Sequence, residues 1–355
     1  MNYNDRFTIG THAISVSDPT YFIADIAANH DGSLSRAKDL IYLAKESGSH
    51  CAKFQHYKAD KIVSDFGFDS LPGENMSHQA GWQKSVAEVY DEVHLKREWN
   101  DELVKTCKDA DIEFMTTPYD IEAIEELIPH VNAVKIGSGD ITFKKLLRSI
   151  SELGKPILLA TGASNMNEVI AAVEVILAAE NRNVCLMQCN TNYTGDSENF
   201  KHVNLNVLKS FGVLFPHMPL GLSDHTPGHS AVLGAIALGA RVIEKHFTDD
   251  NSRIGPDHHF ALNPTSWKEM IDRSEELEDS LGNGVKRVES NELDTVVVQR
   301  RSIRMVRDVK KGEELKLGDI EFLRPCPTDA ISPQNYEVVL GRKLNLDRDR
   351  GDYLR

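Results

Sequence analysis

Short apolar segments recur along most of the chain, and each is followed by a polar or glycine-containing turn and then by apolar residues at helical spacing. The segments that we expect to form strands are residues 21–27, 51–57, 113–118, 133–138, 156–162, 184–190, 219–225 and 241–247. Helical spacing is clearest at residues 33–47, 121–128, 143–153 and 166–179.

This alternation of strands and helices predicts a parallel sheet with right-handed crossovers. Eight such units match a (β/α)₈ barrel, the TIM barrel, which typically has about 250 residues. An open doubly wound sheet is the alternative. The glycine-rich phosphate-binding turn that usually follows its first strand is absent, because residues 29–32 (Asn-His-Asp-Gly) do not form that pattern.

The pattern changes near residue 284. We expect residues 1–285 to form the barrel, the charged segment 286–296 to be a linker, and residues 297–355 to form a small, mostly β domain. A domain of about 60 residues has a marginal core, so it should pack against the barrel or a second subunit.

The connection between residues 57 and 113 is unusually long for a compact domain. Connections of this length are often lids or binding loops. A neutral surface insertion is the alternative.

Nearly every predicted strand carries a polar or charged residue near its carboxyl end. Barrel active sites are built at this end, and buried charges are costly unless they are paired or used. We therefore predict an active site at this rim. The residues are Asp25, Lys53, Gln55, Thr117, Lys135, Ser138, Thr161, Asn190, Asp224, His225, Glu244, Lys245 and His246.

His225 and His246 end consecutive predicted strands, which lie about 4.8 Å apart in a sheet. A single histidine is more often a structural residue, but two at neighbouring strand ends favour a shared divalent cation with open positions for substrate or water. Asp224 and Glu244 are candidates to orient the two imidazoles.

Lys53 and Lys135 lie inside early strands, where a lysine suits phosphate or carboxylate binding, or Schiff-base chemistry. The turns at 137–139 and 161–162 offer backbone N–H groups and hydroxyls to an anion. Three aspartates are candidate proton-transfer or hydroxyl-binding groups: Asp25, Asp140 and Asp257. A helix cap is an equally good interpretation of Asp140.

Composition narrows the class of protein. The net charge of −14 argues against an extended nucleic-acid footprint or binding to an anionic membrane surface. The longest apolar run, residues 231–240, is about half of a membrane span. The N-terminus does not resemble a secretory signal, and the five cysteines are too scattered for a disulfide framework. We expect a cytoplasmic protein with buried free thiols at Cys185 and Cys189.

Several motifs are highly specific when taken together. They are Ala-Asp-Ile-Ala-Ala-Asn-His-Asp-Gly at 24–32, Ala-Lys-Phe-Gln at 52–55, Lys-Ile-Gly-Ser-Gly-Asp at 135–140, Gly-Leu-Ser-Asp-His-Thr at 221–226, Glu-Lys-His-Phe-Thr at 244–248, Gly-Pro-Asp-His at 255–258 and Leu-Arg-Pro at 323–325. Across residues 20–350 or so, the chain resembles the sialic acid (nonulosonic acid) synthases, which include synthases of N-acetylneuraminic, legionaminic and pseudaminic acids.

The resemblance implies a barrel followed by an antifreeze-like (SAF) domain, assembled as a domain-swapped homodimer. It also implies a metal-dependent condensation of phosphoenolpyruvate with the open-chain aldehyde of an N-acylated mannosamine-type sugar, with release of phosphate. His225 and His246 would hold the metal, Mn²⁺ or else Mg²⁺ or Co²⁺, which would polarise the aldehyde oxygen.

The resemblance also assigns the remaining site residues. Asp25 would assist attack of water on the cationic intermediate, and Arg324 would reach the N-acyl group across the dimer. The residues expected around phosphoenolpyruvate are Lys53, Thr117, Lys135, Ser138 and Thr161. Those expected to contact the sugar or orient the reacting groups are Gln55, Asp140, Asn190, Tyr193, Ser223 and Asp257.

Three positions depart from the family pattern. Positions 25 and 140 are normally Glu and are Asp here, and position 160 is often Ser and is Ala. Each carboxylate is one methylene shorter, which leaves more room, so we hypothesise a deoxy or diamino sugar rather than plain N-acetylmannosamine. The segment 190–193 also differs from the typical one.

Two other functions stay open at this point. One is a Schiff-base aldolase on the same barrel that uses Lys53 or Lys135. The other is a non-catalytic sugar-binding protein, which the altered position 25 supports and the presence of both histidines and both lysines opposes.

Overall fold

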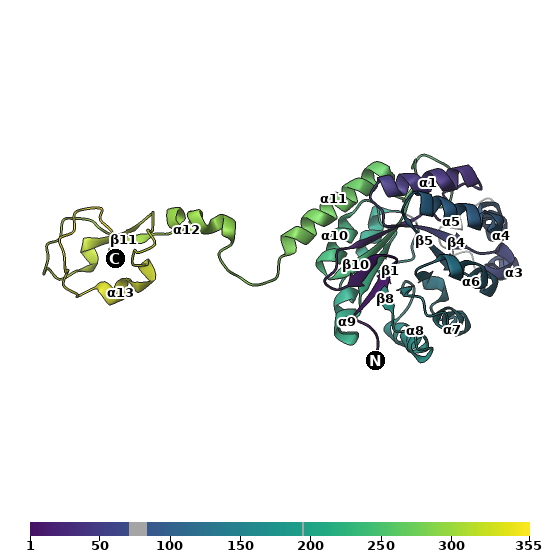
Figure 1. Cartoon of the computed structure of the whole chain (residues 1–355), viewed down its shortest axis with the longest axis horizontal. Helices are drawn as coiled ribbons and strands as arrows, with labels where there is room; N and C mark the ends of the chain where they lie inside the picture. The colour runs from purple at the N-terminus through teal and green to yellow at the C-terminus, as the bar shows by residue number, and fades with distance from the viewer. Residues whose placement is uncertain (71–83, 194) are drawn as a thin grey trace. The chain divides into compact units, whose positions relative to one another are not determined.

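The computed structural model describes residues 1–70, 84–193 and 195–355. Part of the long connection between residues 57 and 113, including Pro72, Gly73, Gly81 and Trp82, lies outside the described residues. The chain divides into two compact units, Met1–Gly282 and Asn283–Arg355 (Figure 1).

The first unit contains a closed barrel of eight parallel strands in the order β10-β3-β4-β5-β6-β7-β8-β9 (Figure 1). This confirms the predicted (β/α)₈ fold, and each predicted strand is present. The strands are β3 (Tyr21–Asp25), β4 (Cys51–His56), β5 (Glu113–Pro118), β6 (Val134–Ile136), β7 (Ile157–Ala160), β8 (Val184–Cys189), β9 (Leu220–Asp224) and β10 (Ala240–His246).

Helices surround the barrel (Figure 1). All four segments with clear helical spacing contain one, and side-chain caps such as Ser33 and Asn165 fix where two of them begin. The helices of this unit are α1 (Leu34–Glu46), α2 (Ala59–Ile62), α3 (Asp65–Asp69), α4 (Val86–Val93), α5 (Asn100–Asp109), α6 (Ile121–Leu127), α7 (Lys144–Ser151), α8 (Met166–Ala178), α9 (Val207–Leu214), α10 (Ser230–Ala237) and α11 (Pro264–Leu281).

Alternate residues of each strand face the barrel interior and the helices. The interior contains a compact apolar layer, and the opposite strand faces join the larger core under the helices. The strand register pairs Asp25 with Lys53 and with His246, which brings these polar side chains to one level at the carboxyl ends. The interior layer is formed by Phe7, Ile9, Ile14, Tyr21, Ile23, Cys51, Met115, Ala133, Leu158, Cys185, Met187 and Val242.

An N-terminal hairpin contributes to that interior layer. It is formed by β1 (Arg6–Ile9) and β2 (His12–Ser15), which pair antiparallel. Gly10 has a φ of +56°, and a Cβ on it would lie 1.7 Å from the carboxylate of Glu113, so the turn requires glycine. The hairpin was not among the strands predicted from the sequence.

The second unit has its own small core around Ile303, Met305 and Leu354. Its elements are α12 (Leu293–Gln299), β11 (Ser302–Met305), β12 (Ile320–Leu323) and α13 (Tyr336–Val339), with β11 and β12 antiparallel. Helix α12 spans the junction between the predicted linker and the predicted small domain. The assignment of this unit as a SAF domain stays a prediction. Within the part of the chain that is described, no helix combines the length and apolar character needed to cross a membrane.

Candidate active site

Buried charges gather at the carboxyl ends of the strands, as predicted. Lys53 Nζ lies 2.8 Å from Asp25 Oδ2, 3.1 Å from Thr117 Oγ1 and 3.7 Å from Glu244 Oε1. Lys135 Nζ lies 2.6 Å from the same Glu244 oxygen. Two ammonium groups and two carboxylates thus form one chain of charges inside the barrel.

The ion pairs decide which of these buried groups carry a charge. Burial disfavours a charge on Lys53, but Asp25 and Glu244 outweigh it and raise the pKa of Lys53. Burial likewise opposes ionisation of Asp25, but Lys53 and His246 outweigh it and lower the pKa of Asp25. Lys53 is therefore a cation suited to an anionic ligand, and its protonated amine is unsuited to act as a Schiff-base nucleophile.

The expectation that Asp224 and Glu244 orient the imidazoles is wrong. Glu244 contacts Lys135 and Ser223, at 2.6 and 3.3 Å. Asp224 accepts a hydrogen bond of 2.6 Å from Lys245 Nζ. Strand alternation explains the result for Asp224, which with Lys245 lies on the opposite strand face from His225 and His246. Glu244 shares the inward face of His246 but pairs with Lys135 instead.

His225 and His246 lie together, with ring centroids 5.3 Å apart. His225 Nδ1 donates to the carbonyl oxygen of Asn190 at 2.8 Å, which leaves its Nε2 as a lone-pair donor. His246 Nδ1 is buried without a hydrogen-bond partner. Two imidazoles at this spacing can share one cation at the roughly 2.1 Å typical of metal–nitrogen bonds, so the residues fit the expected metal.

The pair is not a complete ligand set by itself. Among the described residues, no group of three or more His, Cys, Asp or Glu side chains is arranged to hold a metal ion. Water and substrate would have to fill the remaining positions, which is the pattern of a catalytic site. Burial and the neighbouring His246 lower the pKa of His225 to about 4, which keeps this imidazole neutral and able to bind a cation.

The turns expected to bind an anion lie side by side. Ser138 Oγ accepts a hydrogen bond of 2.9 Å from the Gly162 N–H. Thr161 donates both its Oγ1–H and its backbone N–H to the carbonyl of Met187, each at 3.0 Å, so neither donor is directed at an anion in this structure. A Cβ on Gly162 would lie 2.6 Å from the Thr191 side chain and 2.9 Å from Ser138 Oγ, so the approach requires glycine.

Asp140 follows Ser138 in a short 3₁₀ turn. Burial raises the pKa of Asp140 to about 6, and its Oδ2 is buried without a hydrogen-bond partner. Helix α7 has no side-chain cap, so the interpretation of Asp140 as a cap of that helix is wrong.

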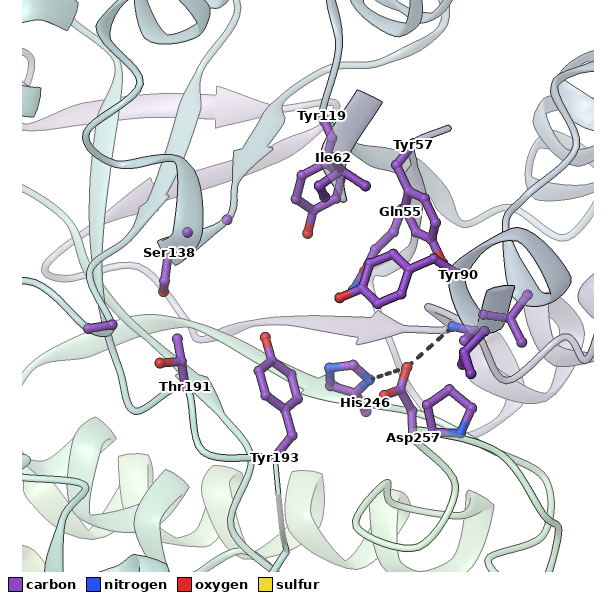
Figure 2. A pocket seen from close by; sticks show the side chains of 17 residues that line it. Gln55, Tyr57, Ile62, Tyr90, Tyr119, Ser138, Thr191, Tyr193, His246 and Asp257 are labelled. Atoms are coloured by element: carbon purple, nitrogen blue, oxygen red, sulfur yellow. Dashed lines mark hydrogen bonds and ion pairs between the residues drawn. The ribbon is translucent and has the colours of Figure 1, made fainter. Parts of the chain in front are cut away.

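A cavity of about 300 Å³ opens above these residues. Of the predicted residues, five line it: Gln55, Ser138, Tyr193, His246 and Asp257. Figure 2 shows these side chains around one space, with dashed lines joining Asp257 to His246 and to a backbone nitrogen.

Other lining residues were not predicted from the sequence, among them Tyr57, Tyr90, Tyr119 and Thr191 (Figure 2). Tyr57 and Tyr119 directly follow β4 and β5, so their position one residue after a strand was an available signal. Tyr90 lies on α4, within the long connection. That connection also contributes Ile62, Val89 and Val93 to the cavity wall, which agrees with the binding-loop interpretation for its described part.

The remaining predicted residues lie outside the cavity lining. Ser223 accepts from Lys135 Nζ at 3.2 Å, below the cavity. The Asn190 amide donates to the His202 carbonyl at 3.3 Å, so this side chain holds the loop after β8. Arg324 is exposed in the second unit directly after β12, and its predicted contact with the sugar stays a prediction.

An aromatic cluster packs on the two histidines. The ring centroid of Tyr193 lies 4.1 Å from that of His225, and the centroid of Phe260 lies 4.9 Å from that of His246. Buried charges, a histidine pair and an aromatic-walled cavity at the carboxyl ends of the strands define the active-site cleft of a (β/α)₈ enzyme.

Comparison with known proteins identifies the family. A family model described as the NeuB family matches residues 40–286. The N,N′-diacetyllegionaminic acid synthase of Campylobacter jejuni is 33% identical, over 91% of this chain and 95% of its own length. The synthase of the same name from Legionella pneumophila is 32% identical, over 94% of this chain and 93% of its own.

A solved structure agrees. That of the N-acetylneuraminic acid (sialic acid) synthetase from Leptospira borgpetersenii is 25% identical, with a TM-score of 0.71, and covers 82% of this chain and 95% of that one. The chain therefore belongs to the NeuB family, which confirms the resemblance stated from its motifs.

Proposed function

We propose that the protein is a nonulosonic acid synthase that condenses phosphoenolpyruvate with an N-acylated mannosamine-type aldehyde sugar and releases phosphate. The observation that carries the proposal is the buried lysine pair beside two histidines. Lys53 and Lys135 are 1 and 2% exposed, and both converge on Glu244. A multiply charged anion that reaches them would replace a carboxylate as their counter-ion.

In this proposal the chain's own residues bind and orient both substrates. Lys53 and Lys135 attract the phosphate and carboxylate groups of phosphoenolpyruvate, and the Ser138 hydroxyl, which accepts from the Gly162 N–H, would donate to the same anion. Asp257 and Gln55 face the cavity, where the sugar would lie. The metal, held by His225 and His246, would polarise the aldehyde oxygen when bound.

Asp25 is placed to act as a base. Its lowered pKa keeps it ionised, and its Oδ2 also accepts from Gln55 Nε2 at 2.9 Å. Carbon 3 of phosphoenolpyruvate forms the new bond to the aldehyde carbon with the electrons of its double bond to carbon 2, and the aldehyde oxygen takes up a proton from solvent to become a hydroxyl. Water then adds to the cationic carbon 2 and loses a proton to Asp25. Phosphate leaves carbon 2 with the bridging oxygen, while the new hydroxyl on carbon 2 loses its proton to the departing phosphate and becomes the carbonyl.

The sugar in this proposal is a deoxy or diamino analogue. Support comes from two relatives whose names state two N-acetyl groups. It also comes from the cavity wall, where Ile62, Val89 and Val93 present apolar side chains that suit a methyl group better than a hydroxyl. Arg324 of a partner chain in a homodimer would complete the N-acyl subsite.

A phosphate-release assay tests the proposal. The protein is incubated with phosphoenolpyruvate and a panel of acylated hexosamines, with Mn²⁺ or with EDTA. We expect release only with Mn²⁺, and the highest kcat/KM for a sugar with two N-acyl groups or a deoxy carbon. A higher kcat/KM for N-acetylmannosamine would reject the sugar assignment, and no release with any sugar would reject the reaction.

A borohydride control addresses the aldolase alternative. A Schiff-base enzyme would be trapped as a covalent adduct on a lysine when borohydride is added with substrate. We expect no adduct, because Lys53 is held protonated between carboxylates.

A further inference from the structure

Two sequence motifs meet beside the cavity, and of their residues the proposed reaction uses only Asp257. One is residues 29–32, in the loop after β3, and the other is residues 255–258, in the loop between β10 and α11. His258 Nε2 lies 2.8 Å from Asp31 Oδ1, across 227 residues of sequence. The contact joins two loops on neighbouring strands of the barrel.

The His258 ring is fixed at both nitrogens. The residue is 0% exposed, and its Nδ1 lies 2.7 Å from Thr248 Oγ1. A carboxylate only accepts hydrogen bonds, so Nε2–H donates to Asp31, while Nδ1 shares a hydrogen bond with the threonine hydroxyl. Both ring nitrogens are engaged, which leaves neither for chemistry.

Arg36 of α1 ties the same two loops together. Its Nε lies 3.2 Å from Asp31 Oδ2 and donates to the Asn29 carbonyl at 2.7 Å. Its Nη1 donates to Asp249 Oδ2 at 2.8 Å, at the start of the loop after β10. Asp31 adopts a φ of +51° in this arrangement, a conformation that aspartate tolerates better than most residues.

The local sequence makes room for the histidine. A Cβ on Gly255 would lie 2.6 Å from His258 Cδ2 and 3.1 Å from its Nε2. Asn251 Nδ2 closes the loop by donating to the carbonyls of His258 and Ala261, at 2.8 and 2.7 Å. The loop is therefore built around the His258 ring.

Asp257 is the residue that this arrangement delivers to the cavity. Its Oδ2 lies 3.5 Å from His246 Nδ1 and 3.4 Å from the Ala28 nitrogen, as Figure 2 shows. We propose that His258 is a positioning residue which, locked between Asp31 and Thr248, holds Asp257 against His246. The kinetic part of this inference rests on the proposed function, and the structural part does not.

Three variants test the inference. His258→Asn and Asp31→Ala each remove the contact between the loops, whereas Asp31→Asn keeps an acceptor for Nε2–H. His130→Asn is the matched control, because His130 is exposed before β6 at the other end of the barrel. Each variant is compared by amide hydrogen exchange over residues 248–262 and by steady-state kinetics.

We expect faster exchange of the Ala261 amide, which donates to the Asp257 carbonyl, in His258→Asn and Asp31→Ala only. Their kcat/KM for the sugar should fall about 10- to 100-fold, the usual cost of losing a partner that orients a functional group. The KM for phosphoenolpyruvate should stay within about 3-fold, because the lysine pair is untouched, and Asp31→Asn should stay near the unaltered enzyme.

A double-mutant cycle separates positioning from general structure. If His258 acts through Asp257, then His258→Asn should reduce kcat/KM little further in an Asp257→Ala background. Additive losses would overturn the proposal, as would native exchange in both His258→Asn and Asp31→Ala.

The two proposals fail in different ways. If no sugar supports phosphate release but exchange changes as expected, the proposed function is wrong and the positioning role stands. If release occurs but the variants match the control in exchange and kinetics, the positioning role is wrong. Should His258→Asn fail to fold, the comparison of Asp31→Asn with Asp31→Ala still decides.

Discussion

Glu244→Gln is the substitution that most sharply separates an anion site from an ordinary buried ion pair. In the unaltered protein, Glu244 Oε1 is 2.6 Å from Lys135 Nζ and 3.7 Å from Lys53 Nζ, and Glu244 Oε2 has no hydrogen-bond partner. Glutamine keeps the shape and removes the charge. Two lysines then face only Asp25, so the pocket gains an uncompensated positive charge.

The expected loss of stability is about 3 kcal/mol, at the lower end of the cost of breaking a buried pair, because glutamine still accepts a hydrogen bond. For a domain of this size that corresponds to a drop in Tm of roughly 6 to 12 °C. Phosphate at about 100 times its Kd stabilises a protein that binds it by ~2.7 kcal/mol, so it should recover most of the stability that Glu244→Gln loses. The variant should also bind phosphate more tightly than the unaltered protein, because its lysines lack one counter-ion.

Asp224→Asn is the matched control. Asp224 and Lys245 form an equally buried pair at 2.6 Å, but they point toward the helices. For Asp224→Asn we expect a similar drop in Tm, but phosphate should raise its Tm no more than it raises the Tm of the unaltered protein. Differential scanning fluorimetry across a phosphate titration measures both variants. Equal phosphate protection of Glu244→Gln and Asp224→Asn would refute the assignment of an anion site.

Three further predictions concern the metal, the pH dependence and the anion-binding turn. His225→Ala and His246→Ala should each abolish Mn²⁺ binding seen by electron paramagnetic resonance. His229, directly before α10, provides the control, and His229→Ala should leave the binding unchanged; retained binding in the first two variants would rule out the metal site. Burial raises the pKa of Asp140 to about 6 in the folded state, so the contribution of Asp140 to stability is present below its unfolded pKa of about 3.8 and is lost as the pH rises through 6. Asp140→Asn should therefore stabilise the protein by about 1 to 2 kcal/mol at pH 8, discounted for its partial exposure, and by little at pH 4; an equal gain in unfolding free energy at both pH values would contradict this. In Gly162→Ala the added Cβ presses on Ser138 and Thr191, so KM for phosphoenolpyruvate should rise about 10-fold, whereas Gly212→Ala, with no atom within 4 Å of its Cβ, should leave it unchanged.

The sequence predicted the barrel because each buried parallel strand is a short apolar run with its own flanking turn. It missed the hairpin of β1 and β2 because two four-residue strands give a weak period-two signal. The hairpin becomes recognisable only in the folded barrel, where Phe7, Ile9 and Ile14 pack against the inward-facing side chains of the strands.

At the site, strand ends identified which residues converge but not which of two adjacent residues points inward. Asp224 illustrates this limit, since it faces away from the barrel interior while the adjacent His225 faces inward. Tyr90 and the His258–Asp31 contact were beyond reach, because both depend on how distant loops fold over the rim.

Oxygen-18 in the bridging position of phosphoenolpyruvate tests the central claim most directly. If the lysine pair binds phosphoenolpyruvate so that water adds to carbon 2, mass spectrometry of the reaction with an N-acylated sugar should find the label in the released phosphate. Label kept in the sugar acid product would show cleavage at phosphorus instead and contradict the account.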